Sequence, residues 1–215
     1  MKKGWLRQMV DYYNNLRGFD KEFEHGIMKF FDVKNKNELY GFKLDEQTEG
    51  WLNEWLWFDF RYSNEMTMLE DFVATDPLNL SEAELGEYKE LLAENVYGFF
   101  EIMRVDLNQG LRLKNISTGK EYEIKERAAT CGAEVGNIMT GRIGKINGHY
   151  ELVGANGVQI HIKMGNNLKK MLMKVKTKYT PKMTFQIISH GSTAEGVPET
   201  VAAMASCDLP LFDHP

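Results

Sequence analysis

The residues best suited to chemistry are a set of lysines in the C-terminal part of the chain. Between Leu152 and Ala194 the sequence has seven lysines and no aspartate or glutamate, although the 215-residue chain carries a net charge of −5. Such a segment attracts anions, either the phosphate backbone of a nucleic acid or an acidic partner protein. The predicted anion-binding residues are Lys163, Lys169, Lys170, Lys174, Lys176, Lys178 and Lys182.

Apolar residues in the same segment recur at helical spacing, which predicts a basic amphipathic helix. Leu168, Met171, Leu172 and Val175 form its apolar face. The lysines then lie on the opposite face, in water, and the simpler interpretation is a solvated helix face without a partner. Because these side chains are expected to face water, charge reversal of Lys169, Lys170 and Lys174 should leave folding intact.

The C-terminal tail contains a second candidate binding feature. Its residues 208–212, Asp-Leu-Pro-Leu-Phe, resemble the short Q-L-x-L-F peptide with which bacterial DNA-processing proteins bind the replication sliding clamp, with Asp in place of the leading Gln. Leu209, Leu211 and Phe212 are the predicted partner-binding residues. Docking of Leu211 and Phe212 onto their own domain is the alternative.

The remaining reactive residue types form no recognisable site. Cys131 has no assignable base, and we expect it to be a small buried residue. Of the five histidines, only His149 and His161 could meet, on neighbouring strands, but no third metal ligand can be named, and ordinary surface or edge histidines are the simpler interpretation. We therefore predict no catalytic residues, no metal site and no cofactor, and we expect the protein to purify without stoichiometric metal. A hydrolytic or metal-dependent enzyme with ligands converging from loops is the alternative.

The aromatic run from Trp51 to Phe60 could stack bases or sugars. Trp51 and Trp55, however, are spaced i,i+4 as on a buried helix face, so we expect the run to form core. Carboxylates near it could supply an acid–base pair, but Glu70 has a capping role and no second motif supports such a pair. These carboxylates are Glu54, Asp59, Glu65, Glu70 and Asp71.

Composition indicates a globular chain, with 43% hydrophobic and 27% charged residues. Two distant cysteines argue against a disulfide scaffold and fit a reducing compartment. The N-terminus begins basic but lacks the apolar stretch of a signal peptide, and no segment approaches the roughly 20 apolar residues that span a bilayer. We expect a cytoplasmic protein without a membrane partner.

The spacing of apolar residues changes near residue 98 from helical to strand-like, and this change predicts the elements that position these residues. Residues 1–97 have helical spacing, and Thr67–Glu70 and Ser81–Glu84 are capping boxes that each open a helix. Residues 98–163 have period 2 and tight turns, including Asn147-Gly148, the strongest two-residue hairpin signal. Strand candidates are Phe99–Asp106, Leu111–Ile116, Tyr122–Lys125, Asn137–Ile146, His149–Val153 and Val158–Lys163.

These elements predict an α+β fold in four parts. A helical region at 1–97 precedes a small antiparallel β-barrel or meander at 98–163, since closure of the barrel hides its strand edges. Residues 164–189 are predicted to hold the basic helix and a possible strand at Thr184–Ser189. Residues 190–215 are predicted to be a flexible tail.

Residues 55–154 carry a recurring pattern of aromatic, turn and core positions. It consists of Trp57-Phe58-Asp59-Phe60, Thr67–Phe72, Phe100-Glu101-Ile102 with Val105, Leu113 with Thr118-Gly119, and Gly136-Asn137 with Gly141-Arg142. The pattern resembles an uncharacterised bacterial domain often found beside a SEC-C zinc motif. The SEC-C cysteines are absent here, so the zinc of that motif is not implied. The resemblance implies the fold without a reaction, and our hypothesis is a non-enzymatic binding or adaptor module associated with nucleic acid.

Overall fold

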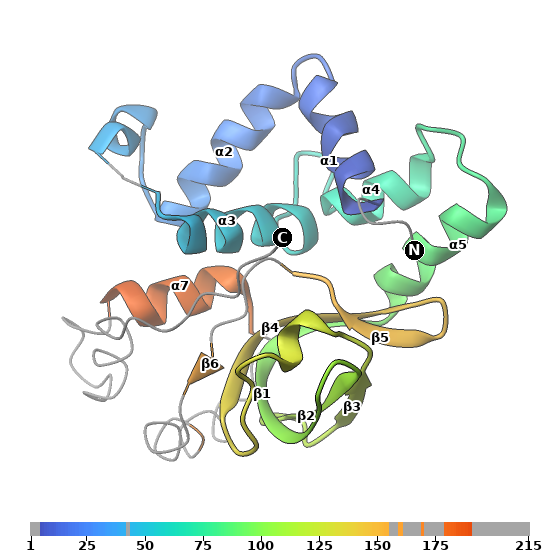
Figure 1. The fold of residues 1–215 in the computed structure, drawn as a ribbon. Helices are drawn as coiled ribbons and strands as arrows, with labels where there is room; N and C mark the ends of the chain where they lie inside the picture. The colour runs from blue at the N-terminus through green and yellow to red at the C-terminus, as the bar shows by residue number, and fades with distance from the viewer. Residues whose placement is uncertain (1–4, 42–43, 155–158, 161–168, 170–178, 191–215) are drawn as a thin grey trace. The chain divides into compact units, whose positions relative to one another are not determined.

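A computed structural model of the chain describes residues 5–41, 44–154, 159–160, 169 and 179–190. The chain divides into two compact units, Met1–Glu94 and Asn95–Pro215. Helices make up the described part of the first unit, and a mixed sheet with a further helix makes up that of the second (Figure 1). The α+β class expected from the sequence is confirmed.

The first unit is built from helices whose starts the sequence marks clearly. They are α1 (Trp5–Asn15), α2 (Phe19–Phe31), the 3-10 helix η1 (Lys36–Gly41), α3 (Glu46–Phe58), α4 (Met68–Thr75) and α5 (Glu82–Ala93). Both predicted capping boxes are present. The Thr67 hydroxyl accepts from the Glu70 amide while the Glu70 carboxylate accepts from the Thr67 amide, and Ser81 and Glu84 do the same at α5.

Large aromatic side chains form the core of the first unit. Trp51, Trp55, Phe58 and Phe60 are each at most 9% exposed. The rings of Trp55 and Phe60 lie 4.9 Å apart between centroids, within the range of favourable aromatic pairs. The interpretation of this run as core, in preference to a stacking surface, is therefore confirmed for these four residues.

The second unit contains a counterpart for each of the six predicted strands. They are β1 (Asn95–Asp106), β2 (Gly110–Asn115), β3 (Glu121–Ile124), β4 (Ile138–Ile146), β5 (His149–Leu152) and β6 (Gln159–Ile160). Asn147 and Gly148 both have positive φ, 51° and 79°, and join the paired residues Ile146 and His149. The predicted two-residue turn is confirmed. The only helix between β2 and β4 is the three-residue 3-10 helix η2 (Ala128–Thr130).

The prediction of a purely antiparallel sheet is wrong, because β5 runs parallel to β3, with Ile124 opposite Tyr150. The relative directions of the strands explain this parallel pairing. β1 and β3 share one direction, since both are antiparallel to β2, and β4 runs opposite to β1. The hairpin then turns β5 back into the direction of β1 and β3. The sheet is therefore mixed.

Strand pairing in the second unit runs in a closed circuit, β1–β2–β3–β5–β4–β1, which we call the strand ring (Figure 1). β6 pairs with β4 outside this circuit. Alternate side chains of the ring point to a shared interior, where Phe100, Ile102, Leu113 and Ile143 are almost fully buried. Ala129 of η2 belongs to the same cluster, so the connection between β3 and β4 contributes to this core.

A helix, α7 (Pro181–His190), stands where the sequence predicted a strand at Thr184–Ser189, and that prediction is wrong. The hydroxyl of Thr180 accepts a hydrogen bond from the Met183 amide, as an N-cap does, and Pro181 occupies the first turn, where its missing N–H is not needed. This start signal outweighs the strand preference of the isoleucines that follow. The predicted basic helix around Leu168 lies outside the described residues, apart from Lys169.

Candidate nucleic-acid interface

Only part of the predicted basic surface lies within the described residues. Lys169 and Lys182 are described, and Lys182 belongs to the first turn of α7. The other predicted anion-binding residues, Lys163, Lys170, Lys174, Lys176 and Lys178, lie outside the described part, as do Leu209, Leu211 and Phe212 of the tail. The clamp-binding hypothesis and most of the lysine hypothesis therefore stay predictions.

The sequence predicted that the side chain of Lys169 faces water, but in the structure it is paired with a carboxylate. Its Nζ atom lies 2.6 Å from both carboxylate oxygens of Glu101 on β1. The side chains of Lys169 and Glu101 are 36% and 20% exposed. The positive charge of Lys169 is thus matched by a carboxylate. Lys169→Glu would place a second carboxylate next to Glu101, so we expect this change to affect folding.

Three outward side chains of β1 contact residues of the acid-free segment. Glu101 pairs with Lys169, the ring of Phe99 lies 5.1 Å from that of Tyr179, and the Tyr97 hydroxyl donates to Thr184 of α7 over 3.0 Å. Residues 169, 179 and 184 therefore contact β1 at successively earlier positions, 101, 99 and 97. The acid-free segment is attached to the outside of the strand ring at these points.

A second charged surface, which the sequence analysis missed, covers the outward side of β1, β2 and β3. Side chains alternate along β2 and β3, so the buried Leu113 and Tyr122 face inward and their neighbours face outward. Beyond Tyr97, Phe99 and Glu101, which contact residues 184, 179 and 169, the outward residues are Arg104 and Asp106 on β1, Arg112 and Lys114 on β2, and Glu121 and Glu123 on β3. This set contains no aromatic residue.

Two arginines on this surface are direct cross-strand neighbours. Arg104 of β1 is paired with Arg112 of β2, and Arg112 is paired with Glu123 of β3. The pairing of Arg104 depends on an irregularity between Ile102 and Arg104, where β1 has one residue more than β2. In a regular ladder Met103 would lie opposite Arg112, and Arg104 would take an inward position.

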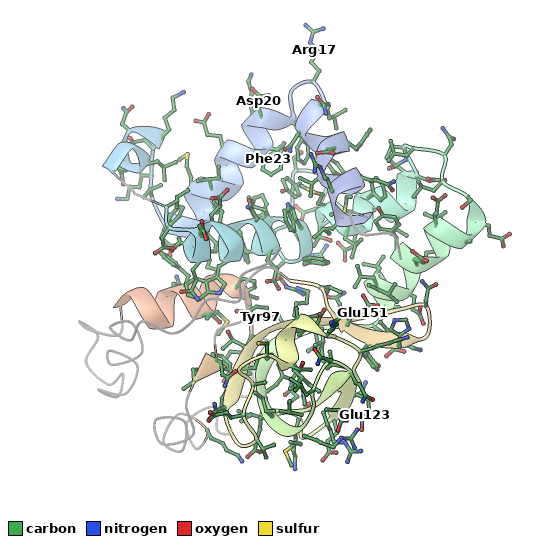
Figure 2. The ribbon with its side chains drawn as sticks, viewed as in Figure 1. Arg17, Asp20, Phe23, Tyr97, Glu123 and Glu151 are labelled. Atoms are coloured by element: carbon green, nitrogen blue, oxygen red, sulfur yellow. The ribbon has the colours of Figure 1, made fainter. Side chains whose placement is uncertain are left out.

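Glu123 bridges the two guanidinium groups. Its Oε2 atom lies 3.1 Å from an Nη atom of Arg104, and its Oε1 atom lies 2.6 Å from Nε of Arg112. Asp106 accepts from Nε of Arg104 at 2.7 Å. Glu123, labelled in Figure 2, has a side chain that is 58% exposed, and those of Arg104 and Arg112 are 47% and 41% exposed.

Arg142, a member of the family-like pattern, has a different environment. It is 1% exposed, its guanidinium donates to Oδ1 of Asn95 at 2.8 Å, and its Cζ atom lies 5.6 Å from the ring centre of Tyr97. The guanidinium is thus held inside the second unit. It is not accessible to an external phosphate.

The residue types usually associated with catalysis do not converge. Among the described residues, no group of three or more His, Cys, Asp or Glu could hold a metal ion. His149 contacts Glu151 through Nε2 at 2.7 Å and the Asn147 carbonyl through Nδ1 at 3.1 Å, and its proposed partner His161 lies outside the described residues. Cys131 is exposed, so the expectation that it is buried is wrong.

Two carboxylates near the aromatic run, Glu70 and Asp71, have structural partners. Glu70 caps α4 and receives two hydrogen bonds from the guanidinium of Arg61. Burial raises the pKa of Glu70, but the Thr67 amide and Arg61 together outweigh it, and the pKa falls below its usual 4.5. Asp71 accepts from the hydroxyl of Tyr13 and from the amide of Asn64. Both side chains are thus engaged in contacts within the first unit.

A hollow of about 700 Å³ in the first unit offers no alternative site. Its lining includes Tyr12, Leu16, Leu78 and Leu80, and Asp11 supplies its one carboxylate. A lone carboxylate beside leucines provides neither a nucleophile–base pair nor a ligand set.

The chain matches no model of a known protein family, no curated protein and no solved structure. Among the described residues, no helix has both the length and the apolar character that a membrane span requires.

Proposed function

We propose that this chain is a non-enzymatic binding module whose second unit contacts the phosphate backbone of nucleic acid. The observation that carries the proposal is the order of the strand ring. An order of β1–β2–β3–β5–β4–β1, with β3 parallel to β5, is that of the five-stranded barrel that binds oligonucleotides and oligosaccharides in many proteins. We infer that the ring is a barrel of this type.

Barrels of this type bind their ligands mainly on the outer face of the second and third strands. A fold by itself does not establish a function, so the chemistry of that face must carry the argument. Here β2 and β3 present Arg112, Lys114, Glu121 and Glu123 on that face, and the adjoining part of β1 adds Arg104 and Asp106. Guanidinium groups suit phosphate oxygens because their N–H groups pair with two oxygens at once.

The absence of aromatic residues from this set of outward positions indicates how binding would occur. Modules that stack bases use exposed aromatic rings, and each stacked base adds affinity. Without such rings, contact rests on the charge of the phosphates, which carries little sequence information. The expected binding is therefore weakly selective and strongly dependent on salt.

The acid-free segment supplies the second part of the proposed interface. It contributes seven lysines, and its described residues Lys169, Tyr179 and Thr184 are attached to the outside of β1. The other lysines of the segment are close to these residues in sequence. We propose that they raise affinity without adding sequence preference.

The proposal is tested by the anisotropy of fluorescent oligonucleotides of about 20 nucleotides, single-stranded and duplex, titrated with the purified chain. We expect binding at about 50 mM salt, with log K falling by about 0.7 per neutralised phosphate on single strands as salt rises. Replacement of Lys170, Lys174 and Lys176 by Gln should lower that slope by about 2. Lys169 is left unchanged because it pairs with Glu101.

A matched control removes the same charge from exposed positions of the first unit, by Lys21→Gln, Lys34→Gln and Lys89→Gln. This triple variant should bind like the unmodified chain. Equal losses in the two triple variants would mean that total charge alone matters, and the proposed interface would be wrong. Absence of binding to either oligonucleotide at about 50 mM salt would overturn the function itself.

A further inference from the structure

We propose that Arg104 and Arg112 form a binding site for one phosphate group, and that Glu123 occupies this site in the free protein. The inference rests on the proposed function and deepens it, because it names the residues on the β1–β2–β3 face that would hold the backbone of a single-stranded nucleic acid. Unlike the lysine hypothesis, it uses only residues that the structure describes and that contact one another.

The backbone of β1 places the two arginines side by side. The extra residue Met103 shifts the register by one, which turns Arg104 from an inward position to an outward one opposite Arg112. β-Bulges often re-aim a side chain in this way next to a functional site. Beyond the bulge, Val105 faces inward opposite Leu111, so the core is maintained.

Like charges directly opposite each other in a sheet repel and are destabilising. An anion between two arginines in register therefore reduces the repulsion between their guanidinium groups. Glu123 provides one, because the register places it next to Arg112 on the third strand. Asp106 contacts Arg104 through a different nitrogen and therefore orients that guanidinium without filling the space between the arginines.

The geometry of Glu123 is the geometry that a phosphodiester would adopt. Each carboxylate oxygen contacts one guanidinium, at 3.1 Å for Arg104 and 2.6 Å for Arg112. A phosphodiester likewise has two non-bridging oxygens and one negative charge, and arginine recognises both groups through the same donors. The exchange of one for the other leaves the number of ion pairs unchanged.

Glu123 can leave this position at low cost. More than half of its side chain is exposed, and the two arginines are also more than 40% exposed. Ion pairs exposed to this degree contribute little to stability and are screened by salt. Glu123 therefore acts as an internal competitor that weakens phosphate binding without closing the site.

The test compares Glu123→Gln with Glu121→Gln, which removes the same charge from the same face and strand. Glu121 lies opposite Lys114, two residues or about 7 Å along β3 from Glu123. Removal of the carboxylate that competes with phosphate for the two arginines is expected to tighten binding about fivefold at low salt, and removal of the more distant one less than twofold. The probe is a fluorescent oligothymidylate, and the readout is its anisotropy.

A second arm uses inorganic phosphate and the Nε–H signals of the arginines in nuclear magnetic resonance spectra. In Glu123→Gln we expect phosphate to shift the signals of Arg104 and Arg112, and Arg112→Gln in that background should abolish both the shift and the gain in oligonucleotide affinity. The double variant also shows whether the effect is local, because it restores the net charge of the unmodified chain.

The two proposals fail in distinguishable ways. Equal tightening by Glu123→Gln and Glu121→Gln, or no phosphate-induced shift in Glu123→Gln, overturns the two-arginine site even if the chain binds oligonucleotides. A phosphate-induced shift without binding of any oligonucleotide supports the two-arginine site as a site for free phosphate and overturns the proposed function.

Discussion

At the scale of single residues, the buried hydroxyl of Tyr13 has a structural role. The Tyr13 hydroxyl lies inside the first unit, where it donates to Oδ2 of Asp71. Burial, followed by the hydrogen bond to Asp71, raises the pKa of Tyr13 well above its usual 10.0. The phenol therefore stays protonated at any physiological pH and acts as a permanent donor.

Tyr13→Phe should lower the free energy of unfolding by about 1.5–3 kcal/mol, because a hydrogen bond to a charged acceptor is lost. Urea denaturation at pH 7 measures the change. Tyr12→Phe is the matched control, since the Tyr12 ring contacts Tyr13 and Phe72 and those contacts survive the change. A cost for Tyr13→Phe no larger than that for Tyr12→Phe would contradict the structural role of the hydroxyl.

Glu70 makes the stability of α4 depend on pH. Its folded-state pKa is lowered, so the unfolded chain binds more protons near pH 4.5, and the stabilisation is lost as pH falls through the folded pKa. Glu70→Gln should therefore be less stable than the unmodified chain at pH 7, and the difference should shrink below about pH 4.5. Urea unfolding at several pH values tests this, with the exposed Glu49→Gln as control. A difference that is constant with pH would contradict it.

At the scale of elements, the turn between β4 and β5 was the most secure prediction. Asn and Gly both accept positive φ, and a two-residue turn with two such residues matches the twist of a hairpin. The sequence signal is local, because Asn147 and Gly148 themselves supply the positive φ that the turn requires.

Gly148→Ala should destabilise the chain by about 1–3 kcal/mol, because its φ of 79° is strained for any residue with a Cβ, even though the space around it is open. Gly86→Ala is the matched control, with open space in the middle of α5, and should instead stabilise by about 0.5–1 kcal/mol. Thermal unfolding of both variants measures the two shifts. Shifts of the same sign would contradict the assignment of strain to the turn.

At the scale of the whole molecule, the second unit has an interior of its own inside the strand ring. A unit with its own core can in principle fold alone. We expect the fragment 95–215 to keep slow amide exchange in β1 and β4. Ile143→Asp in that fragment, a charge placed at a fully buried position, should abolish this protection. Fast exchange throughout the unmodified fragment would show that its ring needs the first unit.

The tail hypothesis also belongs to this scale, because it concerns a partner and stays a prediction. If Leu209, Leu211 and Phe212 bind the bacterial sliding clamp, Leu211→Ala with Phe212→Ala should remove clamp binding in a pull-down and leave oligonucleotide affinity unchanged. Loss of thermal stability in the same variant would instead indicate that these residues dock on their own domain.

Features that a few neighbouring residues encode could be predicted before the structure was known. The capping boxes at Thr67 and Ser81, the Asn147-Gly148 turn and the approximate spans of six strands follow from local hydrogen-bonding capacity, backbone freedom and period. α7 could also have been predicted, since Thr180-Pro181 is a helix start, but its isoleucines pointed toward a strand.

Which distant strands pair and which charges lie together depends on the tertiary structure. The parallel pairing of β3 with β5 depends on where β4 lies, which no local signal records. The site of Arg104, Arg112 and Glu123 depends on one extra residue in β1, and a shift of one residue moves every side chain of a strand to the other face. Register across three strands is a long-range property, and it placed these charges together.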